Sequence, residues 1–134
     1  MEKLAISETK DSPYVLLDPK THVFSIAGVC HPENVTKFYE PIIDWIEAYK
    51  AEVKVSKVSK PIELSLFFKY INSASYKYLL TFLQLVEGFT SLGVPVNVVW
   101  YYEPDDVDMH EAGVEIFDFS GVKLPYVCKV KTEK

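Results

Sequence analysis

The sequence is poor in the residues from which catalytic and metal sites are usually built. Its 134 residues include two cysteines, three histidines and five glycines. No GxGxxG, P-loop or GxSxG pattern is present, so neither a phosphate-binding glycine loop nor a hydrolase nucleophile elbow is expected. CxxC pairs and the HExxH motif are absent as well, and with them the compact zinc signatures. We therefore expect no enzyme activity and no cofactor.

Positive charge, an export signal and long apolar runs are lacking too. The chain has 14 basic and 19 acidic residues, a formal charge of −5, whereas nucleic-acid binders concentrate basic residues on one face. The start MEKLAISETK lacks the basic stretch followed by an apolar run that marks a signal peptide. No apolar run is long enough to span a bilayer. We expect a cytoplasmic protein with reduced cysteines that binds neither nucleic acid nor membrane.

Hydrophobic periodicity predicts one α/β domain over residues 1–134. Apolar side chains recur with helical spacing along 35–49 and alternate along 62–70, as in a strand. Strands are expected at 14–17, 22–27, 62–71, 96–102 and 124–130, and helices along 35–49, at about 75–92 and within 104–118. This order, β-β-α-β-α-β-α-β, favours a mixed, mostly parallel sheet with helices packed on it. The lysine-bearing segment 50–60 is interpreted as a solvated loop, with an anion-binding patch as the alternative.

Two metal-site interpretations are possible, but neither fits a known pattern. Cys30, His31, His110 and Cys128 could supply zinc ligands, yet their spacing matches no compact ligand motif. Residues 106–111 begin like a calcium loop but lack the glycine that such a loop needs at its sixth position. Acidic residues near a helix start more often complement the helix dipole, and a partner-facing acidic surface is an alternative. No metal site is predicted.

The segment Asn72-Ser73-Ala74-Ser75 directly follows the strand expected to be central. Asn and Ser commonly begin helices because their side chains accept hydrogen bonds from free backbone N–H groups. A hydroxyl placed there would also be presented at the top of the sheet, where a kinase can reach it. A phosphate would add about −1.5 to −2 charges beside the positive end of the helix dipole. Ser73 is the candidate phosphorylation site and Ser75 the alternative, with Asn72, Ala74, Ser75 and Tyr76 as candidate partner contacts.

The aromatic run Trp100-Tyr101-Tyr102 ends the next expected strand. Such residues are commonly strand core with one exposed ring edge. Trp100 and Tyr102 are nevertheless candidate partner contacts. In a second hypothesis they form a pocket wall of a small-molecule-sensing module. In a third, His110 and acidic residues converge in the cleft of an enzyme.

Several motifs resemble those of the SiaC family of regulatory phosphoproteins. The resemblance extends from about Leu4 to Val130, nearly the whole chain. The family's Tyr-Phe-Asn-Thr-Ser-Ser is similar to residues 70–75, with Ser73 at the position of its phosphorylated Thr. The other similar motifs are Ser12-Pro13, the segment 28–34 (Gly-x-Ser-Tyr-Pro-Glu-Asn in the family), Phe38-Tyr39 with Trp45, Trp100-Tyr101-Tyr102 with Asp105-Asp106, and Leu124-Pro125-Tyr126. In the segment 28–34, Cys30 and His31 replace the family's Ser-Tyr.

The resemblance implies a STAS-like fold, similar to anti-sigma-factor antagonists, and a role in a bacterial partner-switching circuit. In such a circuit a histidine-kinase-like Ser/Thr kinase would phosphorylate Ser73 and a PP2C-type phosphatase would reverse the modification. The unphosphorylated form would bind an effector such as a diguanylate cyclase, which links the protein to cyclic di-GMP and biofilm regulation.

Overall fold

The computed structural model describes residues 1–132; the last two residues of the predicted domain lie outside the described range. Within that range the strands are β1 (Leu4–Ile6), β2 (Tyr14–Leu17), β3 (Val23–Cys30), β4 (Ile62–Ile71), β5 (Val96–Tyr102) and β6 (Tyr126–Val130). The helices are α1 (Val35–Ser56), α2 (Ser73–Glu87) and α3 (Val107–Ser120), with a short 3₁₀ helix η1 (Thr90–Leu92).

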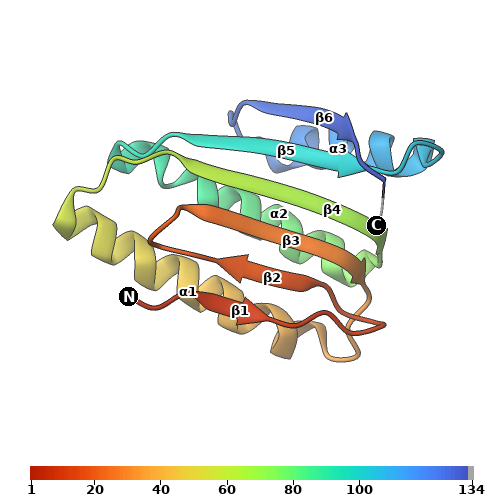
Figure 1. The fold of residues 1–134 in the computed structure, drawn as a ribbon, viewed down its shortest axis with the longest axis horizontal. Coiled ribbons are helices and arrows are strands. Elements are labelled where there is room, and N and C mark those ends of the chain that lie inside the picture. Colours follow the sequence, from red (N-terminus) through yellow and green to blue (C-terminus); the bar gives the residue numbers. More distant parts are fainter. Residues whose placement is uncertain (133–134) are drawn as a thin grey trace.

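The strands form one mixed sheet in the order β1-β2-β3-β4-β5-β6 (Figure 1). The two pairings among β1, β2 and β3 are antiparallel. The three pairings from β3 to β6 are parallel. This confirms the predicted fold class and the central place of β4. The short edge strand β1 precedes the predicted order, since three residues give too little periodicity to be recognised.

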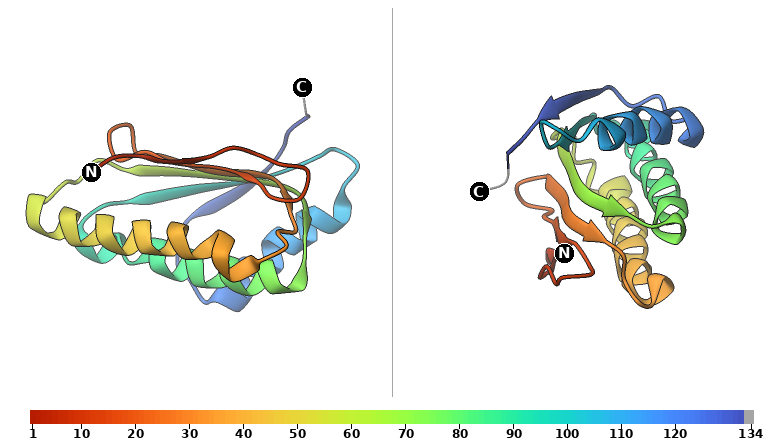
Figure 2. Two further views of the ribbon diagram at one scale, coloured as in Figure 1. Left: turned by 90° about the horizontal axis from the view of Figure 1, so that it is seen from below. Right: turned by 90° about the vertical axis from the view of Figure 1, so that its right-hand side faces the viewer.

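All three α-helices lie on one face of the sheet (Figure 2). Parallel strands that follow one another across a sheet are joined by right-handed crossovers. Because β3, β4, β5 and β6 are added in one direction, each crossover places its helix on the same side. The core lies between these helices and the sheet, where Phe24, Leu66, Phe68 and Trp100 are at most 1% exposed.

Helix α1 is longer than its apolar stripe indicated. It continues to Ser56 and ends at Lys57, whose φ of 56° is left-handed. Residues 50–56, interpreted from the sequence as loop, are therefore helical. The ammonium of Lys50 is partly buried and donates a hydrogen bond to the Leu85 carbonyl at 2.7 Å, in the last turn of α2. Burial lowers the pKa of Lys50.

The second helix begins and ends earlier than predicted. Asn72 caps α2, which starts at Ser73 and ends at Glu87; η1 and Gly93, with a φ of 84°, complete the turn into β5. The predicted start followed the break in the strand at residues 72–75, and the predicted end was placed by Gly93 and Pro95, which mark where a helix cannot continue. Gly88 caps the end of α2, but buried Phe89 continues the apolar stripe beyond it, so the periodicity did not indicate a break there.

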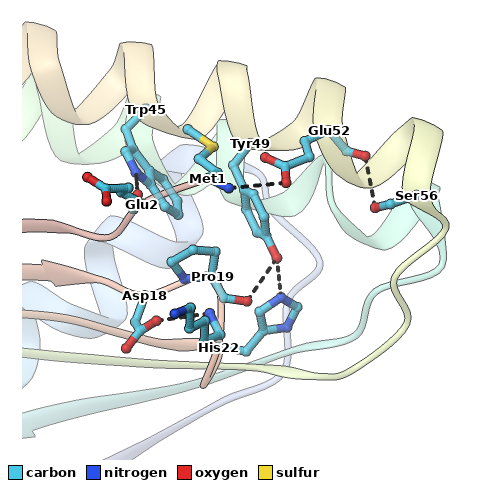
Figure 3. A network of polar contacts seen from close by, with 10 residues as sticks. Met1, Glu2, Asp18, Pro19, His22, Trp45, Tyr49, Glu52 and Ser56 are labelled. Carbon is cyan, nitrogen blue, oxygen red and sulfur yellow. Dashed lines mark hydrogen bonds and ion pairs between the residues drawn. The ribbon is translucent and has the colours of Figure 1, made fainter.

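A buried histidine ties the β2–β3 turn to α1 (Figure 3). His22 is 1% exposed and has a left-handed φ of 60°. Its Nδ1 lies 2.6 Å from the Lys60 carbonyl oxygen, and its Nε2 contacts the Tyr49 hydroxyl. Because a carbonyl only accepts, Nδ1 carries a proton. Both ring nitrogens are satisfied, so His22 has a structural role.

Candidate functional site

Asn72 holds the turn between β4 and α2. Its side-chain oxygen accepts a hydrogen bond from the Ser75 N–H at 2.8 Å, and its carbonyl accepts one from the Tyr76 N–H at 3.0 Å. Its own N–H donates to the Cys30 carbonyl at 3.0 Å, at the end of the neighbouring strand. Asn suits this position because it satisfies N–H groups that the first helical turn leaves free.

The cap places the two candidate serines in different environments. Ser73 is the first residue of α2 and is exposed, as is Ala74. Ser75 is 0% exposed. Successive residues in a helix are separated by about 100° of rotation, so residues two apart point to nearly opposite sides. The exposed corner that begins with Ser73 lies at the edge where β3, β4, β5 and β6 all end (Figure 1).

Behind this corner lies a small buried polar cluster. The Cys30 thiol and the Tyr39 hydroxyl form a hydrogen bond. The Ser75 hydroxyl lies beside them and acts to lower the pKa of both, although it makes no hydrogen bond of ordinary geometry. Burial is the largest effect and raises the pKa of both Cys30 and Tyr39. The thiol is therefore kept protonated, and this cluster is not an activated nucleophile.

Two aromatic rings at the strand ends were not predicted as contact residues. The rings of His31 and Tyr70 lie 5.6 Å apart, and Tyr70 is 50% exposed. The His31 N–H donates to the Asp11 carbonyl at 2.8 Å, which joins the 9–13 loop to the corner. A solvent-facing tyrosine at a strand end is a common element of interfaces. The sequence signal was the alternation along β4, which leaves Tyr70 as its last ring.

The structure corrects two of the predicted partner contacts. Trp100 is 0% exposed, and its indole N–H donates to the Met109 carbonyl at 3.0 Å. A Cβ at Gly113 would lie 2.5 Å from the indole nitrogen, so α3 closes over this ring. Trp100 can therefore neither contact a partner nor line a ligand pocket, and the Trp100/Tyr102 sensing face is not formed. Ser75 is likewise shielded from direct contact.

The remaining predicted contacts are partly accessible. Asn72 and Tyr76 are half-buried, and Tyr102 is half-buried with its ring stacked on His110 at 4.4 Å. The Tyr76 hydroxyl is buried and has no hydrogen-bond partner among the described residues. Burial, and to a lesser extent Glu115, raises the pKa of Tyr76. Its side chain thus packs toward α3.

Neither a metal cluster nor a membrane span is found over residues 1–132. No three His, Cys, Asp or Glu side chains in this range lie together as metal ligands would. Cys30 is buried behind Tyr39, whereas His110 stacks on Tyr102, so the four zinc-ligand candidates are not one group. Asp106 caps α3 by accepting from the Met109 N–H at 3.0 Å, and Asp108 lies in the first turn, as the dipole interpretation of this segment predicted. None of the helices here is long and apolar enough to cross a membrane.

Comparison with known proteins places this fold in one family. The family model described as SiaC family regulatory phosphoprotein matches residues 6–126. An uncharacterized protein of Pseudomonas aeruginosa strain UCBPP-PA14 is 31% identical over 103 residues, which cover 77% of this chain and 78% of the relative.

Solved structures agree with this match. Apo-SiaC from Pseudomonas aeruginosa superposes with a TM-score of 0.83 at 28% identity, over 96% of this chain and 99% of that one. A second structure, with a TM-score of 0.83 at 26% identity and the same coverage, is SiaC as the activator in complex with the diguanylate cyclase SiaD. These matches confirm the resemblance seen in the sequence and the expectation of a regulatory role rather than a catalytic one. The chain belongs to the SiaC family of regulatory phosphoproteins.

Proposed function

We propose that this protein is a cytoplasmic phosphorylation-controlled interaction switch whose phosphoacceptor is Ser73. The observation that carries the proposal is the exposure of Ser73 as the first residue of α2, at the end of central strand β4. A kinase needs to enclose the acceptor hydroxyl, and an exposed turn allows this without unfolding the domain. Ser75, the alternative acceptor, would have to leave the core first.

The local structure tolerates a phosphate on Ser73. Asn72 already satisfies the N–H of Ser75, so the cap does not depend on the Ser73 hydroxyl. The helix N-terminus favours negative charge by about 0.3–1 kcal/mol. The modification therefore changes the charge of the surface rather than its shape. A partner that packs closely on Ser73 and Ala74 would lose contact by repulsion and by the cost of desolvating the phosphate.

The partners are proposed from the family. The complex of Pseudomonas aeruginosa SiaC with the diguanylate cyclase SiaD supports a cyclase as the effector of the unphosphorylated form. A histidine-kinase-like Ser/Thr kinase would add the phosphate and a PP2C-type phosphatase would remove it. The exposed rings of Tyr70 and His31 beside Ser73 offer the apolar contact that such an interface needs.

The phosphorylation site is tested by intact-mass measurement and phosphopeptide mapping of the tagged chain purified from its native host. We expect one phosphate on wild type, none on Ser73→Ala, and one on Ser75→Ala. A matched control is Ser91→Ala, which changes an exposed serine in η1, far from the β4–α2 turn. A phosphate retained on Ser73→Ala and lost from Ser75→Ala would overturn the assignment.

A further inference from the structure

The sheet has a face that no helix of the described chain covers (Figure 2). Four of its strands, β3 to β6, pair in parallel. Parallel sheets occur almost only with both faces covered, whereas antiparallel sheets commonly leave one face in water. A parallel half-sheet with one bare face is thus unusual in a protein that acts alone. We call this side, opposite the helices, the outer face.

Strand register arranges the outer face in rows across β3, β4, β5 and β6. One row is Ala27, Phe67, Tyr101 and Lys129; the next is Ser25, Ser65, Val99 and Val127; the third is Val23, Glu63 and Asn97. The third row is polar, since the Asn97 amide donates to the Glu63 carboxylate at 3.2 Å. The first row, with Val99 and Val127 of the second, forms an apolar area toward the strand ends, the outer-face patch.

An aromatic pair stands in the middle of the outer-face patch. The rings of Phe67 and Tyr101 meet edge to face at 6.4 Å. Phe67 is only 9% exposed yet lies outside the helix-covered core cluster. The Lys131 ammonium lies over both rings, 4.8 Å from the Tyr101 centroid and 5.5 Å from that of Phe67. A cation at such a distance is attracted by the negative ring faces. Lys131 thus shields rings that would otherwise face water.

The charge of the patch is opposite to that of the chain. Lys129 is exposed in the first row, and Lys131 lies over the rings of Phe67 and Tyr101 in the same row. Neither the first nor the second row contains a carboxylate, whereas the whole sequence has a formal net charge of −5. An apolar area with two lysines at one side complements a segment that has an apolar stripe flanked by acidic residues.

We infer that the outer-face patch docks an acidic amphipathic helical segment of a partner protein. Apolar side chains of that segment pack on Tyr101, Val99 and exposed Val127, while its carboxylates pair with Lys129 and Lys131. A single-stranded nucleic acid fits less well, because base stacking needs open ring faces and Phe67 is nearly buried. The inference rests on the sheet alone and does not require phosphorylation of Ser73.

Two synthetic helical peptides of about 18 residues test the surface with the full chain. Both carry the same leucine stripe; one has Glu and the other Lys on its polar positions. Binding is measured by fluorescence anisotropy and mapped by amide chemical shifts. We expect the Glu peptide to bind with a micromolar Kd that weakens in salt, with shifts at Phe67, Val99 and Tyr101.

The decisive variant is the double charge reversal Lys129→Glu/Lys131→Glu. We expect it to weaken Glu-peptide binding by about tenfold or more, while Lys57→Glu, which reverses an exposed charge at the end of α1, leaves binding unchanged. Equal binding of both peptides, shifts confined to the helices, or no binding at about 1 mM would overturn the inference. So would a tighter complex of the patch with oligo(U) RNA, or a dimer in light scattering that buries the patch.

Discussion

The side-chain oxygen of Asn72 accepts a hydrogen bond from the Ser75 N–H at 2.8 Å. This contact fixes where α2 begins, and the start of the helix decides which serine faces solvent. Ser73 is exposed as the first helical residue, and Ser75 points into the core beside Cys30 and Tyr39. The cap and the proposed switch are therefore parts of one turn.

Loss of this cap is expected to destabilise the domain. Asn72→Ala removes the acceptor for the Ser75 N–H and should lower the free energy of unfolding by about 1 kcal/mol. Urea denaturation measures the change. Asn72→Asp keeps an acceptor oxygen and should remain within about 0.5 kcal/mol of wild type. Equal losses in both variants would mean that the hydrogen bond does not set the stability of this turn.

A negative charge at Ser73 is expected to separate stability from binding. Ser73→Asp adds a carboxylate at the start of α2 and should stabilise the fold by about 0.3–1 kcal/mol at low salt. The same variant should bind the proposed diguanylate cyclase partner about tenfold more weakly than Ser73→Ala. Thermal melting and surface plasmon resonance give the two values. Undiminished binding by Ser73→Asp would argue against repulsion at this corner.

Gly113 is expected to resist substitution because Trp100 occupies the space beside it. A Cβ there would approach three Trp100 ring atoms within 2.5–2.7 Å. Gly113→Ala should therefore cost about 1–3 kcal/mol, although alanine favours a helix by about 1 kcal/mol over glycine.

A smaller ring at position 100 provides the control for Gly113→Ala. In a Trp100→Phe background the smaller ring leaves room for the methyl group, so the cost of Gly113→Ala should fall. A double-mutant cycle by chemical denaturation measures this coupling. A cost that stays the same in both backgrounds would rule out the steric explanation.

Stability is expected to decline in alkaline solution through the buried thiol. Burial raises the pKa of Cys30 above its reference value of 9.0, so the unfolded chain loses this proton at a lower pH than the folded one. The stabilisation that results from this difference in pKa is complete below about pH 9, and it disappears as the pH rises through the pKa that Cys30 has in the folded state. Burial also raises the pKa of Tyr39, so its ionisation lowers stability in the same way at higher pH.

Matched serine variants isolate the thiol effect. Cys30→Ser keeps a hydroxyl near Tyr39 but cannot ionise, and should reduce the slope of unfolding free energy against pH between about 9 and 10. Cys128→Ser removes a less buried thiol on edge strand β6 and should change the slope less. If Cys128→Ser changed the slope more than Cys30→Ser, the effect could not come from the Cys30–Tyr39 cluster.

Much of the fold could be predicted from local pattern. Strands β2, β4 and β5 coincide with the predicted ranges because alternating or continuous apolar runs are a property of neighbouring residues. Residues 50–56 of α1 were missed because the lysines of this segment were interpreted as a solvated loop. Helix α2 ends at Glu87 with Gly88 as its C-cap, and this end was not predicted because buried Phe89 continues the apolar stripe past it.

The candidate site was predicted less completely. The turn around Ser73 was recognised, since Asn and Ser at the end of a strand indicate a cap whatever surrounds them. The prediction of Trp100 as a partner contact was wrong: strand alternation cannot tell which face α3 covers, and packing of α3 against the ring at Gly113 leaves it fully buried. Tyr70 and His31 were not predicted as contact residues, because their rings meet only where the ends of two different strands lie side by side.

The sequence by itself determined the succession of strands and helices, the absence of known catalytic motifs, and the hydroxyl that follows the central strand. These are consequences of residue spacing and of backbone chemistry within a few positions. Only the tertiary structure decided that Ser73 rather than Ser75 meets solvent, that Trp100 is enclosed, and that Phe67, Tyr101 and Lys131 gather on a bare sheet face. Those outcomes depend on which elements pack together across the sheet, and this follows from the burial of the whole chain rather than from any local segment.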